Sequence, residues 1–444
     1  MAASNAAPPC RGAAEIVDAV VAGETRAIDE TNAAFARIKA RDGRVRAWRW
    51  LNTDFSRSLA YAVDEAPVKG PLAGAGVGLK DIIDTKDWPT ENGVDTDKGR
   101  RPGTDATAVT RLIAAGAVIL GKTVTTECAF LHPRETVNPH DPERTPGGSS
   151  MGSGAAVGGG MVPLALGSQT VGSVLRPASF CGAWAMKPSW GLIPRTGMLQ
   201  LSHYLDHIGV YGRSARDLAL AIDVLSGDDG HDPASQGVAP SRLTAGLGAR
   251  PLNRPRFIFL RDYAWPEIEP SSAELFGNLA EQLKAPTADM PPLYNDIFDI
   301  AQDVLARDAA FNLGQRYRKA GDLISAPLRE WVVRGFSVGV ERYLTQMNRL
   351  QKMRVAFPKV ISEFDAVIAP ATPGEAPRDL TNTGSPKFNL LWTSIGVPAV
   401  NVPALKGPAG MPVGVQVIGR YGADLETLRA AAWLGHELGA EVVD

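Results

Sequence analysis

The chain has 444 residues, of which 44% are hydrophobic and 21% charged, a composition typical of a globular protein. The formal net charge of −2 supplies no basic field for nucleic acid, so we expect no nucleic-acid partner. Three widely spaced cysteines give neither a disulfide framework nor a zinc-binding spacing. Because the sequence contains no signal peptide and no apolar run long enough to span a bilayer, we predict a cytoplasmic protein without a membrane partner.

Apolar periodicity predicts helices that alternate with short strands along most of the chain. Helices are expected at 13–22, 27–40, 54–66, 106–115, 215–226 and 424–438, and strands at 77–79, 118–120, 257–260, 366–368 and 413–418. Several of these strands are apolar throughout, which is typical of a sheet that is covered on both faces. The fold class predicted is therefore α/β, with one large α/β/α domain and a central mixed β-sheet covered by helices on both faces.

We predict that the single domain, 1–444, has four segments. Residues 13–70 form N-terminal helices, and 71–227 form a catalytic core. Residues 228–357 begin with a Gly/Pro-rich excursion and continue as a largely helical insertion, expected on the substrate side. Residues 358–444 return to the core.

The stretch 146–188 is the most unusual part of the chain, because two Gly/Ser clusters flank an apolar segment at 161–166. That apolar segment is expected to be a buried strand, so the clusters are not simple linkers. Ser149 follows Gly147 and Gly148, and Ser173 follows Gly172, 24 positions after Ser149. Each serine therefore stands where the backbone can bend sharply.

Two local motifs suggest other chemistries. Residues 116–123, GAVILGKT, match the P-loop pattern, but their middle residues favour a buried strand over a phosphate-binding loop. Residues 148–152, GSSMG, match the nucleophile elbow of α/β-hydrolases, with Ser150 at its centre. A strand should precede that elbow, whereas 142–146 read PERTP, and no later histidine carries a distinctive signature. Both motifs remain less favoured alternatives.

A third pattern joins Lys80, Ser149 and Ser173. A serine hydroxyl is a weak nucleophile until a base takes its proton, and a lysine becomes such a base when burial keeps it neutral. A second serine can carry the proton between the two. The N–H groups of residues 170–173 lie in a predicted bend and could converge on a developing oxyanion.

With these residues in view, the chain resembles the amidase signature family over nearly its whole length. The resemblance is most specific in GVGLKDIIDT at 76–85, TPGGSSMGSGAAV at 145–157, GSQTVGSVLRPASFCG at 167–182 and PVGVQVIGR at 412–420. It implies that Ser173 is the nucleophile, Lys80 the general base, and Ser149 a bridging serine preceded by a cis peptide bond. It further implies an oxyanion hole formed by the backbone N–H groups of Thr170, Val171, Gly172 and Ser173. No metal or organic cofactor is implied.

The nucleophile segment departs from the commonest family pattern, DTGGSIR. Gln169 replaces the usual Asp, and Arg176 stands one position later, before Pro177. Val171 replaces a glycine, and a β-branched residue resists positive φ. Either position 171 is not left-handed, therefore, or the oxyanion hole is locally reshaped.

The resemblance implies a serine amidohydrolase that cleaves C–N bonds of a small-molecule amide through an acyl-enzyme. Apolar and aromatic residues at 199–204 and 290–345, if they line the pocket, suggest hydrophobic or aryl amides as substrates, as for an aryl acylamidase, or carbamates, as for a urethanase. The same chemistry extends to esters. The alternatives are the glutaminase-type component of an amidotransferase and a catalytically silent family member that acts as a binding protein. A monomer or homodimer is expected. Candidate substrate-binding residues are Leu199, Leu201, Tyr204, Tyr294 and Trp331.

Overall fold

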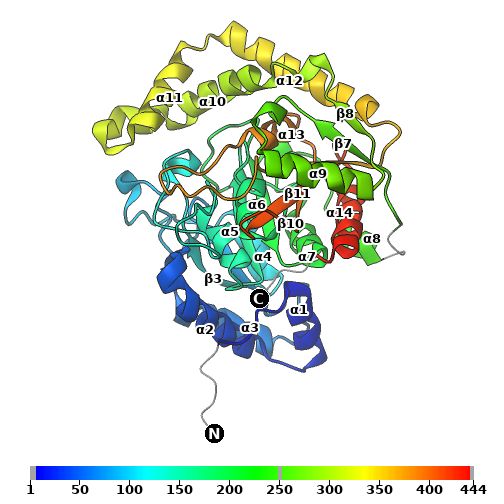
Figure 1. Cartoon of the computed structure of the whole chain (residues 1–444). Coiled ribbons are helices and arrows are strands. Elements are labelled where there is room, and N and C mark those ends of the chain that lie inside the picture. Colours follow the sequence, from blue (N-terminus) through cyan, green and yellow to red (C-terminus); the bar gives the residue numbers. More distant parts are fainter. Residues whose placement is uncertain (1–6, 249–252, 441–444) are drawn as a thin grey trace.

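A mixed β-sheet runs through the centre of the molecule (Figure 1). The computed structural model describes residues 7–248 and 253–440, so both ends of the predicted 1–444 domain lie outside the described residues. Within these residues the sheet has eleven strands, in the order β1-β3-β2-β4-β6-β5-β10-β11-β9-β7-β8. The strands are β1 (Trp48–Leu51), β2 (Gly76–Lys80), β3 (Val118–Thr123), β4 (Leu164–Gln169), β5 (Trp184–Lys187), β6 (His207–Gly212), β7 (Phe257–Arg261), β8 (Thr287–Asp289), β9 (Ala366–Pro370), β10 (Ala399–Lys406) and β11 (Pro412–Ile418).

Parallel and antiparallel pairs are both present, as predicted for a mixed sheet. Strand β2 is parallel to β3 and β4, and β7 is parallel to β8 and β9. Between these two groups, β6, β5, β10 and β11 pair antiparallel with their neighbours. The strand expected at 161–166 begins later, at Leu164, and continues to Gln169.

Helices cover both faces of the sheet, which confirms the predicted α/β class. One buried apolar cluster includes residues of α2, α5, α6 and α10, and a second includes residues of α4, α7, α9 and α14. Strand β3 shows the alternation that this requires, because Val118 and Leu120 belong to the first cluster and Ile119 to the second. The helices are α1 (Ala13–Ala22), α2 (Ala27–Val45), α3 (Thr53–Glu65), α4 (Thr107–Ala114), α5 (Met151–Gly158), α6 (Leu175–Cys181), α7 (Ala215–Leu225), α8 (Leu243–Gly248), α9 (Pro270–Gln282), α10 (Ile297–Ala320), α11 (Ala326–Ser337), α12 (Val340–Val360), α13 (Lys387–Ser394) and α14 (Asp424–Leu438).

The long helices α10, α11 and α12 lie together at one end of the molecule, opposite α1 to α3 (Figure 1). Helices α10 and α11 and most of α12 fall in the segment predicted as an insertion at 228–357, but β7 and β8 of the same segment join the central sheet. The four segment boundaries therefore stay a prediction. Among the described residues, no helix is long and apolar enough to cross a membrane.

The parallel pair β2 and β4 brings distant parts of the sequence to one edge of the sheet. Val77 is opposite Leu164 and Leu79 is opposite Leu166, so both strands end at the same edge. Two short buried helices follow from this edge, α5 directly after Ser149 and Ser150, and α6 shortly after Ser173. They pack so closely that a Cβ at Gly158 would lie 2.1 Å from the carbonyl oxygen of Cys181.

Candidate active site

Lys80 is the last residue of β2, and its side chain is completely buried. The Lys80 Nζ lies 2.6 Å from Ser149 Oγ and 2.8 Å from Ser168 Oγ. Both distances are those of hydrogen bonds, and both partners are hydroxyl groups, so neither fixes a positive charge on the amine. The sequence analysis placed Lys80 and Ser149 in one catalytic set, and in the structure their side chains are in contact.

The electrostatic surroundings of Lys80 favour a neutral amine. Burial lowers the pKa of Lys80 well below its ordinary value, because water no longer solvates the ammonium form. The negative charge of Asp206 opposes this effect, and the positive charge of Arg176 adds to it. A neutral lysine amine has a lone pair that can accept a proton from a hydroxyl group.

Ser149 is held from both sides of its peptide backbone. The Gly148–Ser149 peptide bond is cis, as the resemblance implied. The guanidinium of Arg176 donates to the carbonyl oxygen of Gly148 at 2.5 Å, and the backbone N–H of Thr126 donates to that of Ser149 at 3.2 Å. Burial lowers the pKa of Arg176 to about 9, so this buried donor carries an unusual desolvation penalty.

Gln169 organises the loop that carries Ser173. Its Oε1 accepts hydrogen bonds from the N–H groups of Val174, at 2.8 Å, and Leu175, at 3.0 Å. Its Nε2 donates to Thr393 Oγ1 at 2.9 Å, and that hydroxyl donates to the carbonyl oxygen of Val171 at 2.6 Å. Gln169 therefore satisfies the first N–H groups at the start of α6 and ties the loop to α13.

Residues 170–173 form a bend at the end of β4. Among the described residues, none accepts a hydrogen bond from the N–H of Thr170, Val171, Gly172 or Ser173. Val171 does not have positive φ, which decides between the two possibilities raised by its β-branched side chain. Gly172 is required by space, because a Cβ there would lie 2.4 Å from Asn389 Oδ1. Ser173 keeps 8% of its surface exposed.

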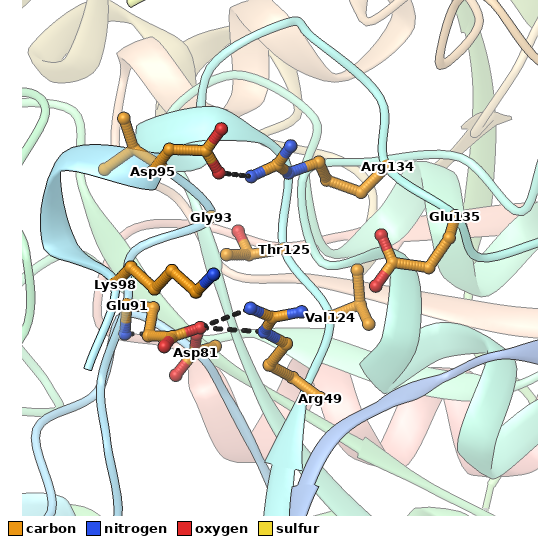
Figure 2. A pocket seen from close by; sticks show the side chains of 11 residues that line it. Arg49, Asp81, Glu91, Gly93, Asp95, Lys98, Val124, Thr125, Arg134 and Glu135 are labelled. Atoms are coloured by element: carbon orange, nitrogen blue, oxygen red, sulfur yellow. Dashed lines mark hydrogen bonds and ion pairs between the residues drawn. The ribbon is translucent and has the colours of Figure 1, made fainter. Parts of the chain in front are cut away.

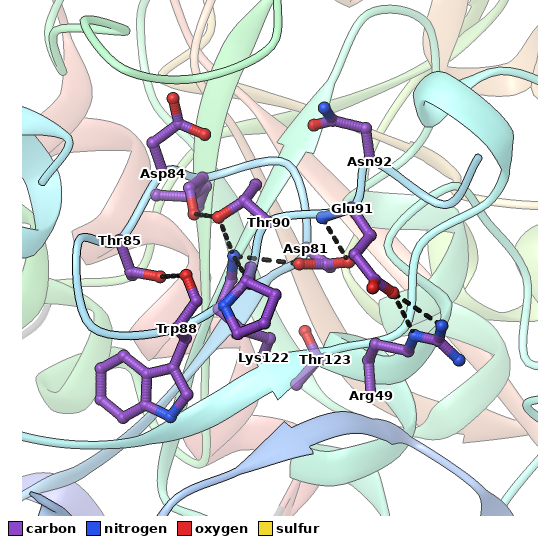
Figure 3. Close-up of polar contacts among 12 residues, drawn as sticks. Arg49, Asp81, Asp84, Thr85, Trp88, Thr90, Glu91, Asn92, Lys122 and Thr123 are labelled. Carbon is purple, nitrogen blue, oxygen red and sulfur yellow. Dashed lines mark hydrogen bonds and ion pairs between the residues drawn. The ribbon is translucent and has the colours of Figure 1, made fainter. Parts of the chain in front are cut away.

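The two competing motifs have structural explanations. Residues 118–123 of the P-loop match are the buried strand β3, as the apolar residues predicted. Lys122 of that motif is buried in an ion pair with Asp81, 3.0 Å away, and donates to Thr90 Oγ1 (Figure 3). Ser150 is fully buried, and its hydroxyl lies 3.2 Å from both the backbone nitrogen and the carbonyl oxygen of Ser168. No described histidine hydrogen-bonds to Ser150.

A cavity of about 140 Å³ lies next to Asp81, the residue that follows β2 (Figure 2). Its lining carries charges of both signs, and two of its three cations are held in ion pairs, Arg49 with Glu91 and Arg134 with Asp95. Its lining includes none of Lys80, Ser149 and Ser173. The lining residues are Arg49, Asp81, Glu91, Gly93, Val94, Asp95, Lys98, Val124, Thr125, Arg134 and Glu135.

The candidate substrate residues occupy different environments. Tyr294 is buried, and its hydroxyl donates to the carbonyl oxygen of Met353 in α12, so this residue packs in the core. Tyr204 lies against Trp190 at 5.6 Å between ring centroids, and Trp331 lies against Phe130 at 5.5 Å. Leu201 is buried, whereas Leu199 is partly exposed. Their roles in substrate binding stay a prediction.

Three contacts around the site were not foreseen from the sequence. Ser168 is a second hydroxyl partner of Lys80, and only its place two residues before Thr170 on a buried strand marks it. Asp206 accepts a hydrogen bond from Thr170 Oγ1 at 2.6 Å. Gln169, noted only as a departure from a pattern, caps α6.

None of the described residues forms a group of three or more His, Cys, Asp or Glu side chains able to hold a metal ion.

The chain is similar to several known proteins over nearly its whole length. The family model described as Amidase matches residues 29–428. A component of the glutamyl-tRNA(Gln) amidotransferase of Koribacter versatilis (strain Ellin345) is 30% identical, over 91% of this chain and 94% of that protein. The AtzE component of the 1-carboxybiuret hydrolase of Pseudomonas sp. (strain ADP) is 32% identical, over 91% and 93%. The solved structure of 6-aminohexanoate cyclic dimer hydrolase complexed with substrate has a TM-score of 0.84 and 25% identity, over 96% and 97%.

Proposed function

Because the chain belongs to the amidase signature family, we propose that it is a serine amidohydrolase with Ser173 as nucleophile, Ser149 as proton bridge and Lys80 as general base. The observation that carries the proposal is the buried contact of 2.6 Å between Lys80 Nζ and Ser149 Oγ. A buried amine bonded only to hydroxyl groups has no structural ion pair to make, so its basicity is free for proton transfer.

The proposed reaction begins when neutral Lys80 accepts the Ser149 proton while Ser149 accepts the proton of Ser173. The Ser173 oxygen attacks the amide carbon, and the negative charge moves to the carbonyl oxygen. No acceptor within the described part of the chain binds the N–H groups of residues 170–173, which supports an oxyanion hole there, since such donors act where charge develops. The C–N bond then breaks, the amine leaves with the returned proton, and water hydrolyses the acyl-enzyme by the same proton path.

We further propose that hydrophobic or aryl amides are preferred, with aryl carbamates and esters as secondary substrates. The support is the aromatic pair formed by Phe130 and Trp331, because Phe130 is connected to the site through Thr126. The Thr126 hydroxyl donates to the carbonyl oxygen of Phe130, while the Thr126 N–H donates to that of Ser149. We propose that these two rings form an apolar wall for the aryl group of a substrate.

A second candidate function is that of the glutaminase-type component of an amidotransferase. Its support is the similarity over nearly the whole chain to components of glutamyl-tRNA(Gln) amidotransferases. Release of ammonia from glutamine separates the two functions. Under the second candidate, glutamine is hydrolysed in preference to aryl amides.

The test is release of aniline from a panel of aryl amides and aryl carbamates by the wild type, Ser173→Ala and Ser150→Ala. We expect no turnover from Ser173→Ala and near wild-type turnover from Ser150→Ala. Wild-type turnover by Ser173→Ala would refute the nucleophile assignment. A wild type that hydrolyses neither the panel nor glutamine would favour the silent binding protein.

A further inference from the structure

Asp206 is a buried carboxylate beside the nucleophile loop. It directly precedes β6, and Gln169 at the end of β4 is opposite His207 in the antiparallel pair β4–β6. Its residue surface is 2% exposed. A charge in such a place has to be compensated by hydrogen bonds or by other charges.

The carboxylate of Asp206 accepts three hydrogen bonds from described residues. Oδ1 accepts from Thr170 Oγ1 at 2.6 Å, and Oδ2 accepts from the N–H groups of Leu201, at 2.7 Å, and Ser202, at 3.0 Å. A protonated carboxyl would need an acceptor, whereas three donors suit the ionised form. Burial raises the pKa of Asp206 above its ordinary value, and these donors together with the charge of Arg195 oppose that effect.

The charged groups around Lys80 and Asp206 come from several elements. Arg176 in α6 and Asp206 act on Lys80 with opposite signs. Arg195 lies near Asp206 but is held in an ion pair with Asp232 at 2.8 Å. Burial keeps the pKa of His207 well below its ordinary value, so that imidazole stays neutral. Lys80 Nζ bonds to Ser168 Oγ, and Asp206 bonds to Thr170, two residues further along the chain, so both charged groups contact the same short segment. The charge of Asp206 is opposite in sign to the one that Lys80 gains with a proton.

The loop that holds Asp206 is also fastened to the long helices. Ser202 Oγ donates to Asp308 of α10, and the hydroxyl of Tyr343 in α12 donates to the same carboxylate at 2.8 Å. The Asn312 side chain donates to the carbonyl oxygen of Leu201 at 3.3 Å. The position of Asp206 is therefore fixed by hydrogen bonds from its loop to the packed helices α10 and α12.

We propose that Asp206 is a positioning residue of the acyl-transfer site: its carboxylate anchors Thr170 in the oxyanion loop, and its charge stabilises the ammonium that Lys80 becomes on accepting the Ser149 proton. This inference rests on the proposed function. The two roles are separable, because Thr170→Val removes the anchor and keeps the charge, whereas Asp206→Asn removes the charge and keeps the size.

The experiment records kcat, KM and the pH profile of kcat/KM for both variants on the best aryl amide. We expect kcat to fall about 10- to 100-fold in each, a magnitude typical of lost positioning or electrostatic support, with a smaller change in KM. Only Asp206→Asn is expected to move the acidic limb of the profile to lower pH, by about one unit, because removal of a nearby anion lowers the pKa of Lys80. A purely structural role would not move that limb.

Two results would overturn the inference: a wild-type kcat and acidic limb in Asp206→Asn, or equal movement of the limb in both variants. Should Asp206→Asn not fold, as judged by circular dichroism, Asp206→Glu and Thr170→Val carry the test. We then expect Asp206→Glu to keep the limb and Thr170→Val to lower kcat, and a wild-type kcat in Thr170→Val would contradict the anchor. Failure of the proposed function itself is recognised separately, by turnover in Ser173→Ala.

Discussion

The molecule contains two buried lysines on neighbouring parallel strands, Lys80 at the end of β2 and Lys122 in β3. Their strands are in register, with Leu79 opposite Lys122 and Lys80 opposite Thr123. Both side chains are fully buried. Burial lowers the pKa of both, since each loses the solvation of its ammonium form.

What differs between the two lysines is the partner. Lys122 faces the carboxylate of Asp81 at 3.0 Å, which opposes the effect of burial and fixes an ion pair (Figure 3). Lys80 faces the hydroxyl groups of Ser149 and Ser168. Equal burial therefore gives a structural cation in one strand and a candidate base in the next.

The largest effect is expected from Lys80→Met. Loss of the proposed base should lower kcat by at least about 10³-fold, as for other residues that act as one catalytic unit. Stability should change little, because a buried amine without a carboxylate partner is replaced by an apolar side chain of similar length. Kinetics on an aryl amide and thermal unfolding measure the two quantities. Retention of more than a tenth of kcat would contradict the role of Lys80.

Lys122→Met should have the opposite pattern, a large loss of stability with little direct effect on kcat. It leaves the Asp81 carboxylate buried without its cation, which is expected to lower the free energy of unfolding by about 3–5 kcal/mol. Urea denaturation measures this loss, and the double variant with Asp81→Asn should recover part of it. A Lys122→Met protein of wild-type stability that has lost its activity would reverse the contrast between the two lysines.

A smaller effect is expected from Gln169→Ala. It removes the acceptor for two N–H groups at the start of α6, a loss comparable to that of a helix cap, about 1 kcal/mol. We expect kcat to fall roughly tenfold as the oxyanion loop loosens. Gln169→Glu keeps the acceptor but loses the donor to Thr393, so its kcat should lie between those of the wild type and Gln169→Ala. Equal kcat in all three proteins would dissociate Gln169 from catalysis.

The smallest effect is expected from Trp331→Ala, which sharpens the substrate assignment. If Trp331 and Phe130 form the apolar wall, KM for an aryl amide should rise several-fold, equivalent to about 1 kcal/mol, the low end for a hydrophobic pocket contact. KM for a small aliphatic amide should not change. Equal changes for both substrates would place the aromatic pair away from the binding site.

Sequence reasoning selected the proposed site residues because they lie in distinctive local patterns. Lys80 ends an apolar strand, and Ser149 and Ser173 follow glycines, so their local conformations could be anticipated. The structure brings Lys80 and Ser149 into contact, and the α/β fold with its mixed, doubly covered sheet is confirmed. The P-loop match was correctly assigned to a strand, since four consecutive apolar residues determine burial more strongly than a glycine–lysine motif.

What the sequence could not give depends on contacts between distant residues. Asp206 meets Thr170 only because β6 pairs with β4, and no local signal announces that register. Strand β10 was not anticipated because it contains Pro403, which removes a backbone donor; the register of β10 with β11 shifts between Val402 and Leu405, around this residue. Both failures reflect tertiary pairing that overrides local propensity.

The most direct test of the proposed serine relay is covalent labelling by a serine-directed phosphonylating reagent, followed by peptide mass spectrometry of the wild type, Lys80→Met and Lys122→Met. This test needs no knowledge of the substrate. We predict that the label is found on Ser173, that Lys80→Met prevents labelling, and that folded Lys122→Met is still labelled. A label on Ser150, or labelling of Lys80→Met at the wild-type rate, would contradict the account.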